Sequence, residues 1–283
     1  MASILKPGQI LKGRLSTYSL VKELYKSTDN GVVNCEEEKC ILKSVPKHWR
    51  LQNESAILKQ YQSKTTHLRP LLDEIQQPSE PSSIVLQYLD TDLLSASNKE
   101  RLSRPKIKQV AKSILEAPSV FHKDELVHTK GQLIGAAISR SPEAAFQLHW
   151  GTATDIWSFG NAILSLIYGG DYHLFNPAIE GYKLEDEEYL YTVLKRMYKF
   201  FGPFPKSYDD FKDPDVIRVV NALHLMGPPE KPFHLVTSRE ISPVDKEFVL
   251  KIMKLDPRDR PTAEQLLADD WFTEESEDTR VPL

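Results

Sequence analysis

The sequence predicts an α+β fold in which a small antiparallel β lobe with one helix is followed by a larger, mainly helical lobe. Two observations support this prediction. Short runs of aromatic and β-branched residues, separated by turn-forming residues, occupy residues 1–89, whereas helical periodicity prevails beyond residue 92. We therefore expect two lobes, at 1–89 and 90–273, and a frayed acidic tail at 274–283.

The strands of the first lobe are predicted from composition. The candidate strands are 16–26 (STYSLVKELYK), 39–45 (KCILKSV), 68–76 (LRPLLDEIQ) and 83–89 (SIVLQYL). Residues 27–31 (STDNG) are a turn signal, which suggests that the first two strands form a hairpin. Apolar residues in 49–62 are spaced to line one side of a helix, so we expect one helix laid on the sheet.

Helices are predicted in four segments of the second lobe. The segments are 106–122, 152–170, 188–203 and 260–272. The first is amphipathic as far as Pro118, which should kink or end it. The second is apolar on nearly every face from 156 to 167 and closes with Gly169, so we expect a buried helix with a glycine C-cap. In the last segment, Thr262 and Gln265 predict a capping box.

The composition is that of an ordinary globular protein, with 40% hydrophobic and 27% charged residues. The formal net charge of -4 gives no electrostatic case for nucleic-acid binding, so we expect a protein or small-molecule partner. The two cysteines, Cys35 and Cys40, have no zinc-ligand spacing and are too few for a disulfide framework. Neither a signal peptide nor a membrane span is predicted, and we expect a cytoplasmic or nuclear protein.

Two longer motifs make the prediction more specific. Residues 141–160 read SPEAAFQLHWGTATDIWSFG, and residues 256–272 read DPRDRPTAEQLLADDWF. These segments resemble the eukaryotic protein kinase family, in which an Ala/Ser-Pro-Glu motif precedes an Asp-x-Trp-Ser-x-Gly helix and an arginine motif precedes the final helix. The resemblance covers essentially the whole chain. It implies the two-lobed kinase-like fold and the family's activity, which is ATP-dependent phosphorylation of protein serine and threonine.

In the first lobe, CILK (40–43) resembles the family's Val-Ala-x-Lys strand, and ESAILKQY (54–61) resembles its small-lobe helix. The resemblance implies that Lys43 presents its charge to phosphate oxygens and that Glu54 holds the lysine in place. The alternative interpretation is a plain surface ion pair, worth ~0 to 1 kcal/mol.

In the second lobe, the resemblance implies structural roles for four residues. Glu143 and Arg260 would form a buried ion pair, and His128 would stand at the histidine of the catalytic loop. Asp155 would accept hydrogen bonds from the backbone of that loop. For Asp155 the alternative is an acid at a helix N-terminus, favoured by the helix dipole.

The nucleotide pocket is matched only in part. STYSLV (16–21) aligns with the family's phosphate-covering turn, but serines and an arginine stand where the family has three glycines. The resemblance implies that Val21 packs on the adenine, that the backbones of Gln87 and Leu89 meet its edge, and that Asp92 reaches the ribose. The same residues also fit a buried strand and its exit. ATP is therefore expected as a weakly held ligand.

The family pattern breaks after Thr129. Residues 120–129 (VFHKDELVHT) match the approach to the catalytic loop, but residues 130–144 (KGQLIGAAISRSPEA) already match the end of the activation segment. The catalytic aspartate, the asparagine beyond it and the Asp-Phe-Gly metal motif are absent, which corresponds to an internal deletion. Because phosphoryl transfer relies on these groups for proton uptake and metal binding, we predict no catalytic residue, no metal ligand and no bound magnesium. We also expect the deletion to uncover apolar surface on the helix at 156–167 and to lower stability.

Three hypotheses about function follow. The chain is a pseudokinase that binds protein partners, a deletion variant of an active serine/threonine kinase, or an active kinase that uses unconventional catalytic residues. The clean excision favours the second hypothesis, whereas the degenerate glycine turn favours the first, and both predict a catalytically inactive chain. The third needs a substitute base, and Asp124 and Glu125 are expected to lie in a turn that does not project into the cleft. No pattern in the sequence predicts the oligomeric state.

Overall fold

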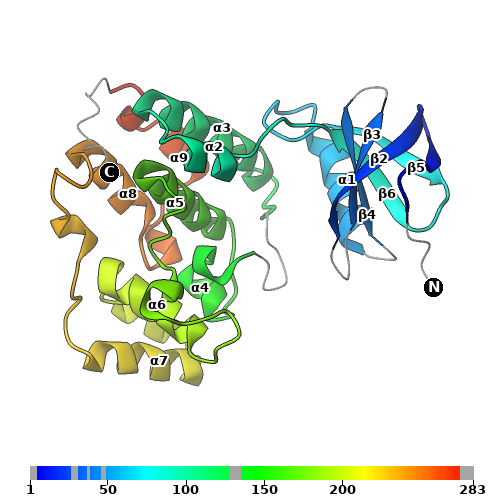
Figure 1. The fold of residues 1–283 in the computed structure, drawn as a ribbon. Helices are drawn as coiled ribbons and strands as arrows, with labels where there is room; N and C mark the ends of the chain where they lie inside the picture. The colour runs from blue at the N-terminus through cyan, green and yellow to red at the C-terminus, as the bar shows by residue number, and fades with distance from the viewer. Residues whose placement is uncertain (1–4, 27–30, 37–38, 46–48, 128–134, 275–283) are drawn as a thin grey trace. The chain divides into compact units, whose positions relative to one another are not determined.

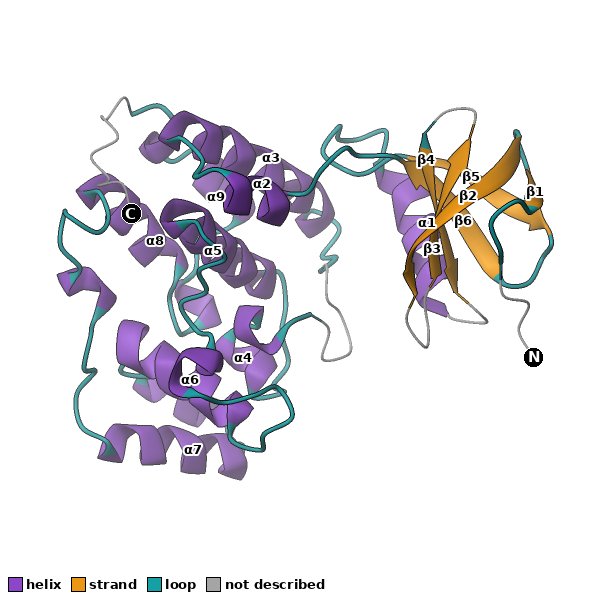
Figure 2. Ribbon diagram, viewed as in Figure 1, coloured by secondary structure: helices purple, strands orange, loops and turns teal. Residues whose placement is uncertain are grey.

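The computed structural model describes residues 5–26, 31–36, 39–45, 49–127 and 135–274, with the backbone alone at 25–26 and 31–36. The fold is α+β, as predicted. The chain divides into two compact units, Met1–Asp92 and Leu93–Leu283, which we call unit 1 and unit 2 and describe separately (Figures 1 and 2). The boundary lies after Asp92, whereas the sequence suggested residue 89.

Unit 1 is an antiparallel sheet that curls until its end strands meet. Its strands are β1 (Ile10–Gly13), β2 (Thr17–Lys26), β3 (Gly31–Glu36), β4 (Cys40–Val45), β5 (Leu71–Gln77) and β6 (Ser82–Gln87). Their order in the sheet is β1-β2-β3-β4-β6-β5, and β5 pairs in turn with β1. The predicted helix is α1 (Trp49–Tyr61), which lies against one face of the sheet near β5 and β6 (Figure 2).

The predicted hairpin between 16–26 and 39–45 is wrong in its pairing. β2 pairs with β3, and β3 then pairs with β4, so an additional strand separates the two that were expected to be neighbours. The composition of β3 does not predict a strand, because Gly31 and Asn34 are poor strand formers. The residues of the turn signal at 27–30 lie outside the described residues.

Alternation along β4 divides the core of unit 1 between the two faces of the sheet. One cluster contains Leu5, Leu11, Leu20, Cys40, Leu42 and Val85, and the other contains Ile41, Val45, Leu51, Leu58, Ile84 and Leu86. Leu51 and Leu58 belong to α1, so the second cluster fills the space between the sheet and the helix. Lys43 alternates in step with Ile41 and Val45, which places it on the face that α1 covers.

Unit 2 is helical. Its helices are α2 (Leu93–Lys99), α3 (Arg104–His122), α4 (Pro142–Ala145), α5 (Ala153–Tyr168), α6 (Tyr189–Phe201), α7 (Pro214–Leu225), α8 (Pro243–Ile252) and α9 (Ala263–Leu267). A 3-10 turn, η1 (Ala137–Ser139), precedes α4. The capping box between Thr262 and Gln265 at the start of α9 is confirmed. Within the described residues, no helix combines the length and the apolar character that crossing a bilayer requires.

Helix α5 is the centre of unit 2, and α3, α4, α6, α8 and α9 surround it (Figure 1). It ends at the C-cap Gly169, as predicted. The expectation that α5 would expose apolar surface is wrong, because Ile156, Trp157, Phe159, Ile163, Leu164, Leu166 and Ile167 are all at most 6% exposed. Ala162 is the half-buried exception among the apolar residues of this stretch. The elements packed around α5 therefore cover its apolar residues.

Pro118 was predicted to kink or end the helix. It does not end it, because α3 continues past Pro118 to His122. Pro118 has no N–H to donate to the carbonyl of Ile114, and this defect costs a helix roughly 3 kcal/mol. Packing compensates, because α3 lies against α5 and α9 and buries Ile107 and Leu115. Tertiary contact thus outweighs the local preference.

A close approach at Gly160 yields a first prediction. A methyl group built on Gly160 would lie 2.5 Å from both Ile252 Cγ2 and Met253 Sδ, where α5 meets the end of α8. We expect Gly160→Ala to lower the free energy of unfolding, because overpacking costs roughly 1–3 kcal/mol and exceeds the helix-propensity gain of about 1 kcal/mol. Gly151→Ala is the matched control, since a methyl group there meets no described atom within 4 Å. Equal urea midpoints for the two variants would contradict this packing.

Candidate functional site

Lys43 of β4 and Glu54 of α1 are neighbours on the helix-covered face of the sheet. Lys43 Nζ donates a hydrogen bond to Glu54 Oε2 at 2.6 Å. Each side chain is 33% exposed, so the ion pair itself contributes only ~0 to 1 kcal/mol to stability. Its effect is geometric, because it holds an ammonium group in one place on a rigid strand. A positioned ammonium group can bind a phosphate oxygen.

The other residues of the expected nucleotide pocket do not lie together beside Lys43. Val21 is exposed on β2, and β3 lies between β2 and the strand that carries Lys43. The pairing of β2 with β3 shifts register between Leu20 and Lys22, so Val21 sits in a bulge. Leu89 is exposed beyond the end of β6. Asp92 is exposed as well, at the last position of unit 1. The structure brings Lys43 together with Glu54 but does not bring Val21 beside them.

Gln87 uses its backbone groups within unit 1. Its N–H donates to the carbonyl of Pro70 at 3.0 Å, and its carbonyl accepts from Arg69 Nε at 2.7 Å. The strand position is favourable, because β6 pairs directly with β4 and Gln87 lies opposite Cys40. An adenine that binds at Gln87 would have to share the Gln87 carbonyl with Arg69 or displace Arg69 from it. This competition favours weak binding of a base at Gln87.

The segment matched to the phosphate-covering turn is held by a buried carboxylate. Only residues 14–16 form the turn, because residues from Thr17 onward are already in β2. Asp73 of β5 accepts hydrogen bonds from the N–H groups of Arg14 at 3.1 Å, Leu15 at 3.0 Å and Ser16 at 3.2 Å. The backbone N–H groups of this turn therefore face an anion of the protein itself.

Gly13 is required where this carboxylate approaches the chain. A methyl group at Gly13 would collide with the carboxylate of Asp73 and with the ring of Tyr18. The Tyr18 hydroxyl also donates to Asp73 Oδ2 at 3.1 Å. The sequence did not identify Asp73 as important. The available signal was an acidic residue inside the apolar run 68–76, since a buried acid must have partners.

Glu74, the next residue of β5, ties the same turn to helix α1. Lys59 Nζ lies 2.6 Å from Glu74 Oε2, and Ser55 Oγ donates to Glu74 Oε1 at 2.5 Å. Arg14 Nη1 lies 3.7 Å from the same carboxylate. Because Ser55 follows Glu54 directly, this contact fixes the turn of α1 that faces Lys43. Glu74 thus acts as a support for the Lys43–Glu54 pair.

The environment of Asp73 lowers the pKa of its carboxyl below the usual 3.8. Burial acts in the opposite direction, but hydrogen bonds from the backbone of Leu15, Glu74 and Ser16 and from the Tyr18 hydroxyl outweigh it. A carboxyl whose pKa is lower in the folded state than in the unfolded state stabilises the fold at pH values above its unfolded-state pKa. That contribution is lost as the pH falls through the folded-state pKa.

Glu143 and Arg260 form a bidentate ion pair inside unit 2. Arg260 Nη1 donates to Glu143 Oε1 at 2.7 Å and Nη2 donates to Oε2 at 2.9 Å, and both side chains are at most 1% exposed. The remaining guanidinium N–H groups donate to the carbonyls of Lys254, Leu255 and Ala153. The Thr154 hydroxyl donates to Glu143 Oε1 at 3.0 Å. The pair therefore joins α4, the start of α5 and the segment before α9.

Asp155 joins the end of α3 to the start of α5. Its Oδ2 lies 3.0 Å from His122 Nε2, and both side chains are largely buried. Asp155 is in the first turn of α5, as the helix-dipole alternative also requires. His122 was not identified from the sequence. His128 lies outside the described residues.

Comparisons with known proteins do not identify a relative. No protein-family model matches the chain, and no curated protein matches it significantly. Among the described residues, no group of three or more histidine, cysteine, aspartate or glutamate side chains is placed to hold a metal ion.

The hydrogen bonds that Asp73 accepts from the turn at 14–16, which we call the clamp, predict a specific pH dependence. Asp73→Asn should lower the free energy of unfolding near neutral pH by roughly 1–3 kcal/mol, because an amide cannot accept all the hydrogen bonds of the carboxylate. The difference from the unmodified protein should shrink as the pH falls below 3.8 toward the folded-state pKa. Urea unfolding across this range measures it. Asp90→Asn, at an exposed position, is the control, and a difference that stays constant with pH would refute the clamp.

The buried ion pair predicts a large loss of stability. Glu143→Ala should lower the free energy of unfolding by about 3–5 kcal/mol, because it leaves the Arg260 charge buried without its counter-ion. Asp215→Ala removes one partner of the exposed Asp215–Arg218 pair and should cost at most about 1 kcal/mol. Chemical denaturation of both variants gives the comparison. Similar losses for the two would show that the burial of Glu143 does not matter.

Proposed function

We propose that this chain has the two-lobed fold of the eukaryotic protein kinases, that it does not transfer phosphate, and that it acts by binding other proteins. The observation that carries the proposal is that both residue pairs implied by the sequence motifs are in contact. Lys43 meets Glu54, and Glu143 meets Arg260. Glu143 and Arg260 are 117 positions apart, so local structure cannot account for their contact.

The order of elements supports the same proposal. A strand that bears a lysine is followed by a helix that bears its glutamate, then by two further strands of the same sheet and a helical unit. The family uses such a lysine and glutamate to position the phosphates of ATP. The buried pair in unit 2 is the kind of contact that stabilises a scaffold whether or not the scaffold performs chemistry.

The absence of phosphate transfer follows from the short connection between α3 and η1. Residues 123–136 (KDELVHTKGQLIGA) are all that joins these elements. They contain no asparagine and no Asp-Phe-Gly motif, and their acidic residues, Asp124 and Glu125, are exposed directly after α3. Phosphoryl transfer needs a group that takes up the hydroxyl proton and groups that hold magnesium between the phosphates. The connection supplies neither.

ATP is proposed as a weakly held ligand that needs no magnesium. Lys43 is positioned to meet a phosphate, but the carbonyl of Gln87 is engaged by Arg69 and Val21 lies two strands from Lys43. A single charged contact with few contacts to the base gives low affinity. A pseudokinase and a deletion variant of an active kinase fit these features equally. Sequencing transcripts across the codons for Thr129 and Lys130 separates them, because a longer usual transcript would favour the deletion variant.

The proposal predicts no phosphotransferase activity. With magnesium and excess ATP, the purified chain should transfer no phosphate to generic protein substrates above background. Lys43→Ala should give the same background. Turnover that disappears in Lys43→Ala would instead establish an active kinase with unconventional catalytic residues.

The proposal also predicts a small response to nucleotide. Millimolar ATP should raise the melting temperature by about 1–2 °C, as expected when the ligand concentration is close to Kd. The rise should not depend on magnesium and should vanish in Lys43→Ala. Lys12→Ala, which removes an exposed lysine of β1, should leave it unchanged. A rise that magnesium enlarges severalfold would contradict the proposed mode of binding.

A further inference from the structure

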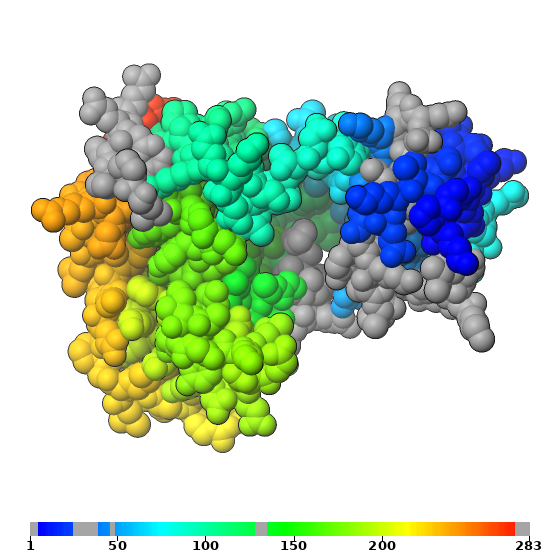
Figure 3. Space-filling view, in the orientation of Figure 1, coloured from blue at the N-terminus to red at the C-terminus, as the bar shows by residue number. Residues whose placement is uncertain are grey.

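A pocket of about 180 Å³ opens in unit 2 between α2, α3 and α5. Its walls come from the first turns of α2, from Ile114 of α3, from one face of α5 and from Asp171 and His173 beyond α5. Figure 3 shows the teal atoms around residues 93–100 beside the green atoms of the chain around the end of α5 on one face of unit 2. The residues that line the pocket all belong to unit 2, and Lys43 is not among them.

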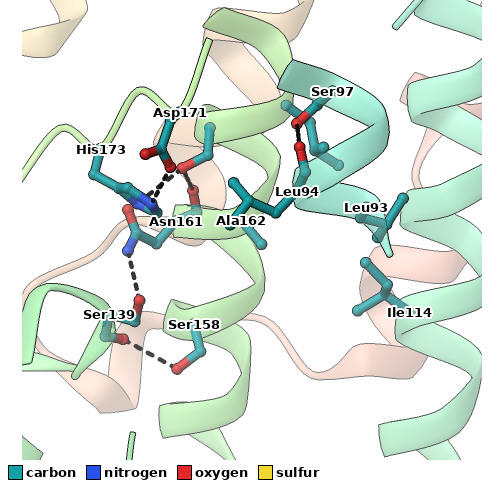
Figure 4. Close-up of a pocket in the computed structure, with 12 residues that line it drawn as sticks. Leu93, Leu94, Ser97, Ile114, Ser139, Ser158, Asn161, Ala162, Asp171 and His173 are labelled. Carbon is teal, nitrogen blue, oxygen red and sulfur yellow. Dashed lines mark hydrogen bonds and ion pairs between the residues drawn. The ribbon is translucent and has the colours of Figure 1, made fainter. Parts of the chain in front are cut away.

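One side of the pocket is apolar. Leu93, Leu94 and Ile114 stand on this side, and Ala162 of α5 lies between them and the polar side (Figure 4). Leu93 and Leu94 are exposed at its mouth. An engineered apolar cavity of about 150 Å³ in another protein holds one benzene molecule. The pocket therefore has the size for one aromatic ring or an aliphatic group of similar volume.

The hydroxyl groups on the other side are already paired. Ser158 Oγ donates to the carbonyl of Ser139 at 3.1 Å, and Ser165 Oγ donates to the carbonyl of Asn161 at 3.1 Å. Ser165 Oγ also lies 3.3 Å from His173 Nδ1. These contacts hold the polar wall in place, and they leave few hydroxyl groups to recognise a ligand.

The rim of the pocket carries a negatively charged side chain, Asp171. Asp171 stands at the rim with its side chain 60% exposed, 3.6 Å from His173 Nε2. No lysine or arginine occurs among the described residues that line the pocket. In the wall, Asn161 Oδ1 is a buried acceptor without a hydrogen-bond partner among the described residues. Both features favour a ligand that brings a cation or hydrogen-bond donor, and both disfavour an anion.

We propose that this pocket binds a small organic amine whose apolar body is about the size of one aromatic ring. The body lies against Leu93, Leu94, Ile114 and Ala162, and the ammonium group faces Asp171. The inference goes beyond the proposed function, because it does not depend on nucleotide binding or on the kinase-like fold.

Three probes of nearly equal size and different charge test the proposal on the full chain. Benzylamine is a cation, benzyl alcohol is neutral, and benzoate is an anion. NMR titration should show that benzylamine perturbs residues lining the pocket and binds about tenfold more tightly than benzoate, because Asp171 attracts the ammonium group and repels the carboxylate. Benzyl alcohol should bind with intermediate affinity. Equal affinity of benzylamine and benzoate, or perturbations confined to residues elsewhere, would overturn the proposal.

Two variants locate the binding. Ala162→Leu fills the pocket from a half-buried position and should abolish binding of all three probes. Asp171→Asn removes the charge, and asparagine also tolerates the left-handed backbone at this position, where φ is 57°. It should leave benzyl alcohol binding unchanged and bring the affinities for benzylamine and benzoate within about twofold of each other. Benzylamine binding that survives Ala162→Leu would overturn the proposal. If Ala162→Leu fails to fold, an undiminished preference for benzylamine in Asp171→Asn is sufficient to overturn it.

Discussion

The buried pairing of Glu143 with Arg260 is the interaction on which unit 2 depends most. A guanidinium group removed from water is costly unless every donor finds an acceptor. Here each guanidinium nitrogen donates to Glu143 or to a backbone carbonyl, and the guanidinium also lies 5.0 Å from the centre of the Trp157 ring. The acceptors come from α4, from the start of α5 and from the segment after α8. Because the Arg260 guanidinium binds acceptors in all three segments, it fixes α4 and the segment after α8 relative to α5.

A carboxylate has the corresponding role in unit 1. Asp73 holds the turn between β1 and β2, and its neighbour Glu74 holds Ser55 and Lys59 of α1. Two adjacent acids of β5 thus connect a turn and a helix that are distant in sequence. The contact between Lys43 and Glu54 differs from the contacts of Asp73, because both of its side chains are 33% exposed whereas Asp73 is buried. Asp73 therefore stabilises the fold from within, whereas the Lys43–Glu54 pair is accessible to a ligand.

This division of roles fits the proposed function, in which the chain is a scaffold that does not transfer phosphate. In unit 2, His122 with Asp155 links α3 to α5 at the start of the connection that leads to η1. The packing around α5 leaves Ala162 half-buried beside a pocket that has a negative rim. Under the proposed function, the chain would present surfaces to partners and hold ATP loosely, and the pocket in unit 2 would add a separate site for a small cation.

Patterns with a fixed period were predictable from the sequence. The apolar run of α5, the glycine at its end and the capping box of Thr262 with Gln265 depend on neighbours within one or two turns. The helices that were missed also carry local signals, since α7 and α8 begin with Asp213-Pro214 and Ser242-Pro243.

The sequence by itself determined the α+β class, because the class follows from local periodicity. The pairing of Lys43 with Glu54 and of Glu143 with Arg260 was implied by the resemblance of short motifs to the protein kinase family, and the structure has both contacts. Tertiary structure alone decided the insertion of β3 between β2 and β4, since strand pairing depends on residues that sequence proximity does not link. It also decided the continuation of α3 through Pro118, where packing outweighs a lost hydrogen bond. The partners of Asp73 likewise emerged only in the folded chain, because a buried charge is satisfied by whichever donors the fold brings to it.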